Sequence, residues 1–165
     1  MNIDFVLLAD AATVDGSGKL NILGVLDRIQ AQEFPARHGR IAMVLRFSAD
    51  PDDAGKHEVE IRLRDPEDQE VLKVGGQIQF TPRRGAGAVE SGAEGIKVPQ
   101  VLNLDGIQFA GPGRYRFEVS VDGEVLASAP LRLETFAGTG PPMSPGSGQR
   151  GAPGFVLVSG DPAEA

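Results

Sequence analysis

The stretch Gly16-Ser17-Gly18-Lys19 contains the residue types that bind phosphate in nucleotide-binding loops. Such a loop needs a glycine, four residues, and then Gly-Lys followed by Ser or Thr, because backbone N–H groups surround the phosphates, the lysine meets the outer phosphates and the hydroxyl holds magnesium. Here Thr13 occupies the first glycine position and Leu20 occupies the hydroxyl position. The residues after Lys19 read as a strand, whereas a phosphate loop must open a helix. We therefore predict a hairpin turn and no nucleotide site.

Two acidic loops supply the oxygen ligands that Ca²⁺ prefers. The loops contain Asp50, Asp52 and Asp53, and Asp65, Glu67 and Asp68. The strand expected at about residues 57–64 would hold them roughly 25 Å apart, at its opposite ends. We therefore interpret both loops as ordinary turns started by Asp and Pro. Weak calcium binding by a single loop remains an alternative.

Catalytic and metal-binding side chains are scarce. The chain has two histidines, His38 and His57, and no cysteine, which excludes disulfides, thiolate catalysis and cysteine-bound zinc. We expect His57 to be exposed on a strand and His38 to lie in a connecting segment. No serine lies in a G-x-S-x-G nucleophile elbow. We predict a protein that is not an enzyme and that holds no cofactor and no metal.

The composition narrows the classes of partner. The 165 residues carry a formal net charge of −7, which opposes binding to nucleic acid and to anionic membranes, because both depend on basic side chains. The first apolar run ends at Asp10, and no run approaches the roughly 18 residues of a membrane span. We expect a cytoplasmic protein that binds neither nucleic acid nor membranes.

Alternation of apolar and polar residues dominates the chain and predicts strands. The clearest case is Tyr115–Val121, and the Asp122-Gly123 that follows it is a strong hairpin signal, since both residues tolerate a positive φ. We expect about eight strands, at residues 3–13, 19–32, 40–48, 56–64, 70–80, 98–109, 113–122 and 124–134. This pattern predicts an all-β fold over residues 1–136, an antiparallel two-sheet sandwich of the Ig-like or C2-like kind.

The string from Ala9 to Ile29 contains the pattern A-D-x-A-x-x-x-G-x-G-K-L-N-I-L-G. It resembles the opening of an uncharacterised family of small bacterial proteins. The resemblance implies a compact β-sandwich over about residues 1–136. It implies no activity.

Two stretches fall outside the strand pattern. Residues 82–95 are Gly-rich and include Arg83 and Arg84, local positive charges that could meet an acidic partner. Residues 137–154 are rich in Gly and Pro and predict a flexible linker. A short apolar C-terminal segment and a polar end, residues 155–165, follow the linker, and the segment begins with Phe155, Val156, Leu157 and Val158.

The apolar segment leads to our expectation for function. A β-prone run on a flexible tether can add a strand to an open sheet edge. The sequence leaves open whether it stays free, docks on its own domain, or docks on a second copy or another protein. We expect a binding or assembly module that associates with a protein partner or with itself, through sheet edges or this segment. The alternatives are a small-ligand site or an enzyme at the 82–95 loop, and the calcium-dependent module.

Overall fold

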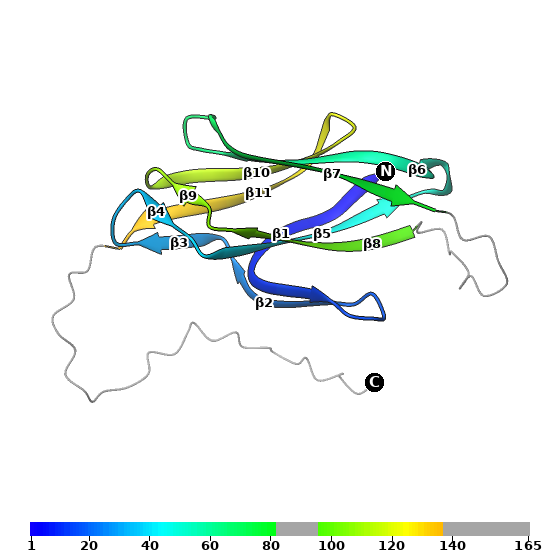
Figure 1. The fold of residues 1–165 in the computed structure, drawn as a ribbon, viewed down its shortest axis with the longest axis horizontal. Helices are drawn as coiled ribbons and strands as arrows, with labels where there is room; N and C mark the ends of the chain where they lie inside the picture. The colour runs from blue at the N-terminus through cyan, green and yellow to red at the C-terminus, as the bar shows by residue number, and fades with distance from the viewer. Residues whose placement is uncertain (82–95, 137–165) are drawn as a thin grey trace, which may run out of the picture.

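A computed structural model describes residues 1–81 and 96–136 of the chain and confirms an all-β fold (Figure 1). The strands are β1 (Asn2–Val14), β2 (Leu20–Leu26), β3 (Arg28–Ala31), β4 (Ala36–Arg37), β5 (Arg40–Ala49), β6 (Gly55–Arg64), β7 (Glu70–Phe80), β8 (Ile96–Asp105), β9 (Gln108–Phe109), β10 (Gly113–Val121) and β11 (Glu124–Thr135). A short 3-10 helix, η1 (Pro51–Asp53), precedes β6. The expected linker and C-terminal segment lie outside the described residues.

The strands form two main sheets and one small one. The four-stranded sheet A has the order β2-β1-β5-β8, and the five-stranded sheet B has the order β3-β11-β10-β6-β7. Strands β4 and β9 pair separately. The expectation of an antiparallel fold is wrong at one place, because β3 pairs with β11 in parallel.

Both predicted hairpins form, for local reasons. Asp122 and Gly123 adopt φ values of 50° and 87°, so this turn has the two positive φ angles that match the twist of β10 and β11. In the β1–β2 turn the Asp15 carboxylate accepts hydrogen bonds from the N–H groups of Ser17 (2.8 Å) and Lys19 (3.0 Å). Leu20 then begins a strand, so the suspected phosphate loop is a hairpin turn.

The two main sheets share one hydrophobic core. Sheet A contributes alternating residues of β5, including Met43 and Phe47, and sheet B contributes Phe117 of β10 among others. Tyr115 is also a core residue, as its phase in the strand predicted, with 2% of its surface exposed. Its ring meets Phe109 edge-on at 5.1 Å between centroids.

Two predicted strands are broken in the structure. The strand expected at 19–32 divides at Asp27, and β2 lies in sheet A while β3 lies in sheet B. At the break, the Asp27 carbonyl accepts a hydrogen bond from the N–H of Arg132. The strand expected at 98–109 divides at Gly106, which has a φ of 68°. Because of the break at Asp27, the chain crosses from β2 in sheet A to β3 in sheet B and links the two sheets along one side of the molecule.

The outer face of sheet B is covered by charged pairs. Lys73 approaches Glu60 at 2.6 Å, and Arg64 approaches Glu118 at 3.3 Å. These pairs join β7, β6 and β10 across the face that points away from the core. This face is therefore a hydrated, charged surface, in contrast to the side of the molecule between β7 and β8.

Candidate functional site

A groove runs between β7 and β8. The strand orders place these two strands at the edges of the sheets opposite β3 and β2 (strands labelled in Figure 1). These strands end sheets B and A respectively, and each pairs with a single neighbour among the described strands. The first part of the groove has a volume of ≈ 240 Å³. The lining residues are Leu45, Phe47, Val59, Ile61, Val74, Gly75, Gly76, Gln77, Ile78, Gln100, Val101 and Leu102. All of them are uncharged.

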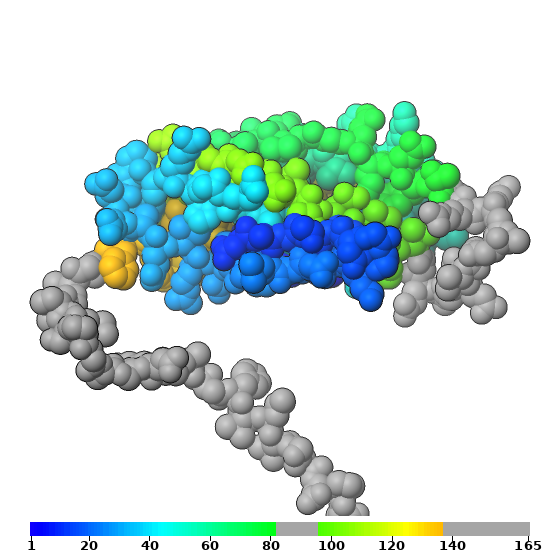
Figure 2. Space-filling view, turned by 60° about the horizontal axis from the view of Figure 1, so that its bottom comes forward, coloured from blue at the N-terminus to red at the C-terminus, as the bar shows by residue number. Residues whose placement is uncertain are grey.

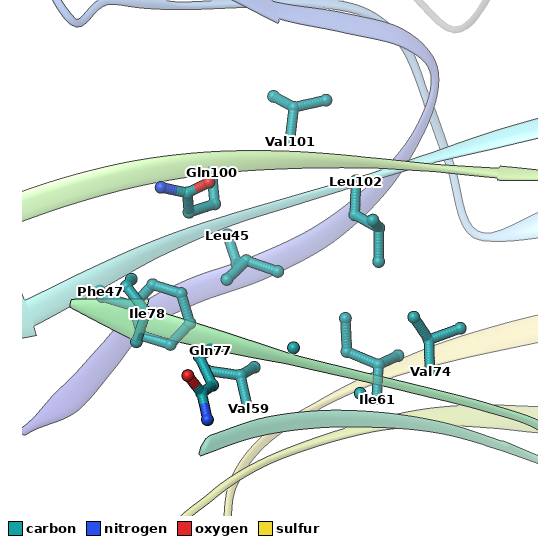
Figure 3. A pocket seen from close by; sticks show the side chains of 12 residues that line it. Leu45, Phe47, Val59, Ile61, Val74, Gln77, Ile78, Gln100, Val101 and Leu102 are labelled. Atoms are coloured by element: carbon teal, nitrogen blue, oxygen red, sulfur yellow. The ribbon is translucent and has the colours of Figure 1, made fainter. Parts of the chain in front are cut away.

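The strand alternation determines which side chains enter this part of the groove. Leu45 and Leu102 point from sheet A towards Val59 and Ile61 of sheet B, whereas Val101 points away (Figure 3). Because successive side chains of a strand point to opposite faces, Leu102 and Gln100 share one face of β8. The groove therefore has an apolar floor and an amide group at its rim.

A second hollow, of ≈ 400 Å³, continues the groove towards Gln108. Val74 and Leu102 line both parts, so the two are contiguous. One charged side chain, Asp105, lines the second part. The guanidinium of Arg40 donates a hydrogen bond to its carboxylate at 2.7 Å and holds the pKa of Asp105 below its usual value. The charge at this end of the groove is thus already paired.

Gly75 and Gly76 lie in the middle of β7, at the rim of the groove. A Cβ atom added at either position would meet nothing within 4 Å, so packing within the described structure does not require these glycines. Glycine inside a strand weakens it, and it often marks a place where another backbone approaches closely. The pair therefore suits the approach of an extended chain to this edge.

His57 forms a second cluster, with Asp53 and Asp122, at the start of β6. Its Nδ1 lies 2.7 Å from the Asp122 carboxylate, and its Nε2 lies 2.9 Å from the Asp53 carbonyl oxygen. A neutral imidazole has one N–H, so donating to both acceptors requires the charged form. The hydrogen bonds to Asp122 and to the Asp53 carbonyl raise the pKa of His57. Because both ring nitrogens are hydrogen-bonded, the His57 ring links η1, which contains Asp53, to the β10–β11 turn, which contains Asp122.

The expectation that His57 is exposed is wrong. Its side chain is 18% exposed and meets the Phe80 ring edge-on at 5.8 Å between centroids. The physical reason is phase, since residue 57 shares the inward face of β6 with Val59 and Ile61. His38, as expected, lies in the segment between two strands, and its N–H donates to the Ile107 carbonyl.

The edge strand β2 carries exposed apolar side chains. Leu23 is 70% exposed and Val25 is 68% exposed. The β1–β2 hairpin lies at the molecular surface in the dark blue region of Figure 2. β2 pairs with β1 alone among the described strands. It is therefore a second surface on which a protein could pack.

The residues proposed from the sequence for partner binding, Phe155, Val156, Leu157, Val158, Arg83 and Arg84, lie outside the described residues. Of the acidic loops, the Asp65 carboxylate accepts the backbone N–H groups of Glu67 and Gln69, which is turn chemistry. Within residues 1–81 and 96–136, no group of three or more acidic or histidine side chains is arranged to hold a metal ion. The same part of the chain contains no helix with the length and hydropathy of a bilayer span.

Sequence reasoning did not find the groove. The signals that could have found it are the Gly75-Gly76 doublet inside an alternating strand and the polar Gln100 on the same face as Leu102. Neither signal shows that β7 and β8 face each other, because that depends on which strands end the two sheets.

Comparisons with known proteins identify the family. The model of a family described as a family of unknown function (DUF6941) matches residues 4–134, so the chain belongs to that family. No curated protein matches the chain. Among solved structures, a Pseudomonas fluorescens alkylpurine DNA glycosylase AlkC bound to DNA containing an abasic site analog matches with a TM-score of 0.41 and 14% sequence identity. That match covers 80% of this chain and 30% of the glycosylase chain.

Proposed function

We propose that this member of the DUF6941 family is a non-enzymatic binding module that takes an extended peptide strand into the β7–β8 groove. The observation that supports it most is a groove between two strands that each end a sheet, whose first part is uncharged and largely apolar. An added strand bonds to the main chain of an edge and places alternate side chains in pockets. Both elements of this mode are present along the groove.

The chemistry of the groove favours the side chains and backbone of a peptide. Apolar side chains form its floor, and the side-chain amide of Gln100, on the same face of β8 as Leu102, can donate to and accept from a peptide backbone. Gly76, which lies opposite Val59 on the groove-facing side of β7, leaves room for that backbone.

A titration of the ¹⁵N-labelled full-length chain carrying Leu157→Asp tests the proposal, because this change removes an apolar segment of the chain that could compete with an added peptide. The probe is a synthetic peptide of alternating Val and Thr with a Lys at each end. We expect its addition to shift the amide resonances of Gly75, Gly76 and Gln100. Shifts confined to other strands, or no shifts, would contradict the proposal.

A pair of variants with the same added charge separates groove binding from general effects. Val74→Lys places an ammonium group in the groove and should abolish the shifts. Gln79→Lys places the same charge on the outer face of β7 and should leave them unchanged. Denaturant midpoints of both variants show whether either change unfolds the domain. Equal binding by a folded Val74→Lys variant would count against the groove.

A second candidate function is self-association through β2, which the exposure of Leu23 and Val25 favours. Apolar side chains on an edge strand promote pairing with another edge. Sedimentation velocity over a concentration series should detect a dimer in the native chain. A Leu23→Lys variant should then remain monomeric, and a concentration-independent monomer in the native chain would remove this candidate.

Two finer expectations belong to the proposal. An Ig-like sandwich is supported by Tyr115, whose hydroxyl donates to the carbonyl oxygen of Gly111 at 3.0 Å, as the tyrosine does at the corner of such folds. An experimental structure with its strand order would test this assignment. A cytoplasmic location is the other expectation, and fractionation of cells expressing the native gene tests it.

A further inference from the structure

We propose that the occupant of the β7–β8 groove is the C-terminal segment Phe155–Val158 of this same chain. The inference rests on the proposed function, because it assigns a ligand to the groove described there. The charge and side-chain alternation of this segment, and the length of the chain that connects it to β11, can each be compared with the groove.

The segment matches the groove in charge. Residues 151–160 contain no charged side chain, on a chain whose net charge is −7. The twelve residues that line the first part of the groove are uncharged as well. This part of the groove penalises charged peptides, because it offers no partner for a desolvated charge. Few stretches of this chain outside its described strands are as apolar as Phe155-Val156-Leu157-Val158.

The segment also matches the groove in its periodicity. In an extended strand, Phe155 and Leu157 point to one side and Val156 and Val158 to the other. One pair can therefore enter the groove over Leu45 and Ile61, while the other pair covers its rim. The backbone of the segment would approach β7 beside Gly76, where a Cβ atom would meet no atom of the described residues within 4 Å.

The tether is long enough for docking within one molecule. Through the strand registers of sheet B, Pro130 lies level with Glu70. Thr135 is five residues beyond this level on one side and Gly76 is six residues beyond it on the other. Those eleven residues correspond to about 36 Å along the strands. Fully extended, residues 137–154 span at most about 60 Å, so the segment can reach the groove of its own domain.

A nitroxide spin label on the full-length chain tests this assignment. The sequence has no cysteine, so a Ser159→Cys variant accepts the label at a single site next to the segment. We expect loss of amide peak intensity at Gly75, Gly76 and Gln100. A second change, Leu157→Asp, should restore those peaks in the labelled chain. Intensity losses that avoid the groove, or that persist with Leu157→Asp, would overturn the assignment.

Two further samples make the result specific. The first sample mixes two chains, one with ¹⁵N and no spin label and the other with the spin label and no ¹⁵N. It shows whether the segment of a second copy enters the groove. Broadening of the groove resonances, in this mixture or in the chain that carries both labels, supports the segment as the occupant. The Val-Thr probe peptide separates the two proposals. Groove shifts with the probe but no broadening from the label overturn this inference alone, and the absence of both effects overturns the proposed function as well.

Discussion

Replacing Gly76 by Val should strengthen the domain and weaken peptide binding at the same time. Gly76 lies on the groove-facing side of β7, opposite Val59 of β6. The neighbouring Gly75 lies on the outer face, opposite Glu60. Neither glycine has a positive φ, and a Cβ at either position meets nothing within 4 Å. Gly75→Val is therefore a matched control that adds the same atoms on the other side of the strand.

The size of the stability change follows from these positions. Glycine in a strand interior costs about 0.5–1 kcal/mol relative to alanine. A cross-strand pair with Val59 adds roughly 0.2–1 kcal/mol for Gly76→Val. We expect an increase of about 1 kcal/mol in the free energy of unfolding for Gly76→Val and a slightly smaller increase for Gly75→Val.

Urea unfolding and the probe titration measure the two effects on the same samples. Gly76→Val should raise the urea midpoint and reduce probe affinity at least tenfold, because its isopropyl group occupies the space that the peptide needs. Gly75→Val should raise the midpoint with affinity unchanged. Equal affinities for the two variants would refute the idea that β7 keeps Gly76 for a backbone that docks in the groove. A loss of stability in both variants would refute the interpretation that the packing of the domain does not require Gly75 and Gly76.

Other predictions concern the hydrogen bonds of His57, the Tyr115 hydroxyl and the Asp15 turn. The raised pKa of His57 means that its contribution to stability is complete below its ordinary pKa of 6.5 and is lost as pH rises through the raised value; urea midpoints followed from mildly acidic to alkaline pH should fall in the native protein and stay flatter in Asp122→Asn. Tyr115→Phe removes the hydroxyl that bonds to Gly111 and should cost about 1 kcal/mol in urea unfolding, whereas a neutral result would mean that the corner does not stabilise the fold. Asp15→Ala should lower the melting temperature, since the carboxylate accepts three hydrogen bonds in its turn, and magnesium-ATP should leave the melting temperature of the native protein unchanged; a rise with the nucleotide would reopen the phosphate-loop interpretation.

Local patterns predicted much of the fold. The alternation around Tyr115 and the Asp122-Gly123 pair specified a hairpin, because side-chain phase and turn conformation depend on neighbouring residues alone. The absence of a serine or threonine after Lys19 likewise separated a turn from a phosphate loop. The same local evidence misplaced His57, whose position on the inward face could have been counted from Val59.

The candidate site was beyond the reach of such patterns. Nothing near Gly75 in the sequence says that β7 ends one sheet and that β8 ends the other. The break at Asp27, which sends β2 and β3 into different sheets, is equally hard to read, because Leu20–Ala31 is a continuous strand-like run. At the break, the Asp27 carbonyl accepts a hydrogen bond from the N–H of Arg132, more than one hundred residues away, and β3 pairs with β11.

The sequence alone determined that the chain forms strands and tight turns, that Tyr115 and the residues in phase with it face a core, and that the C-terminal segment is apolar and uncharged. The tertiary structure decided which strands end the sheets, which side of the molecule is linked by a crossing and which side carries the groove. The physical reason is that alternation and turn chemistry act between neighbours in sequence. The order of strands in a sheet is instead selected by the burial of apolar faces from distant parts of the chain.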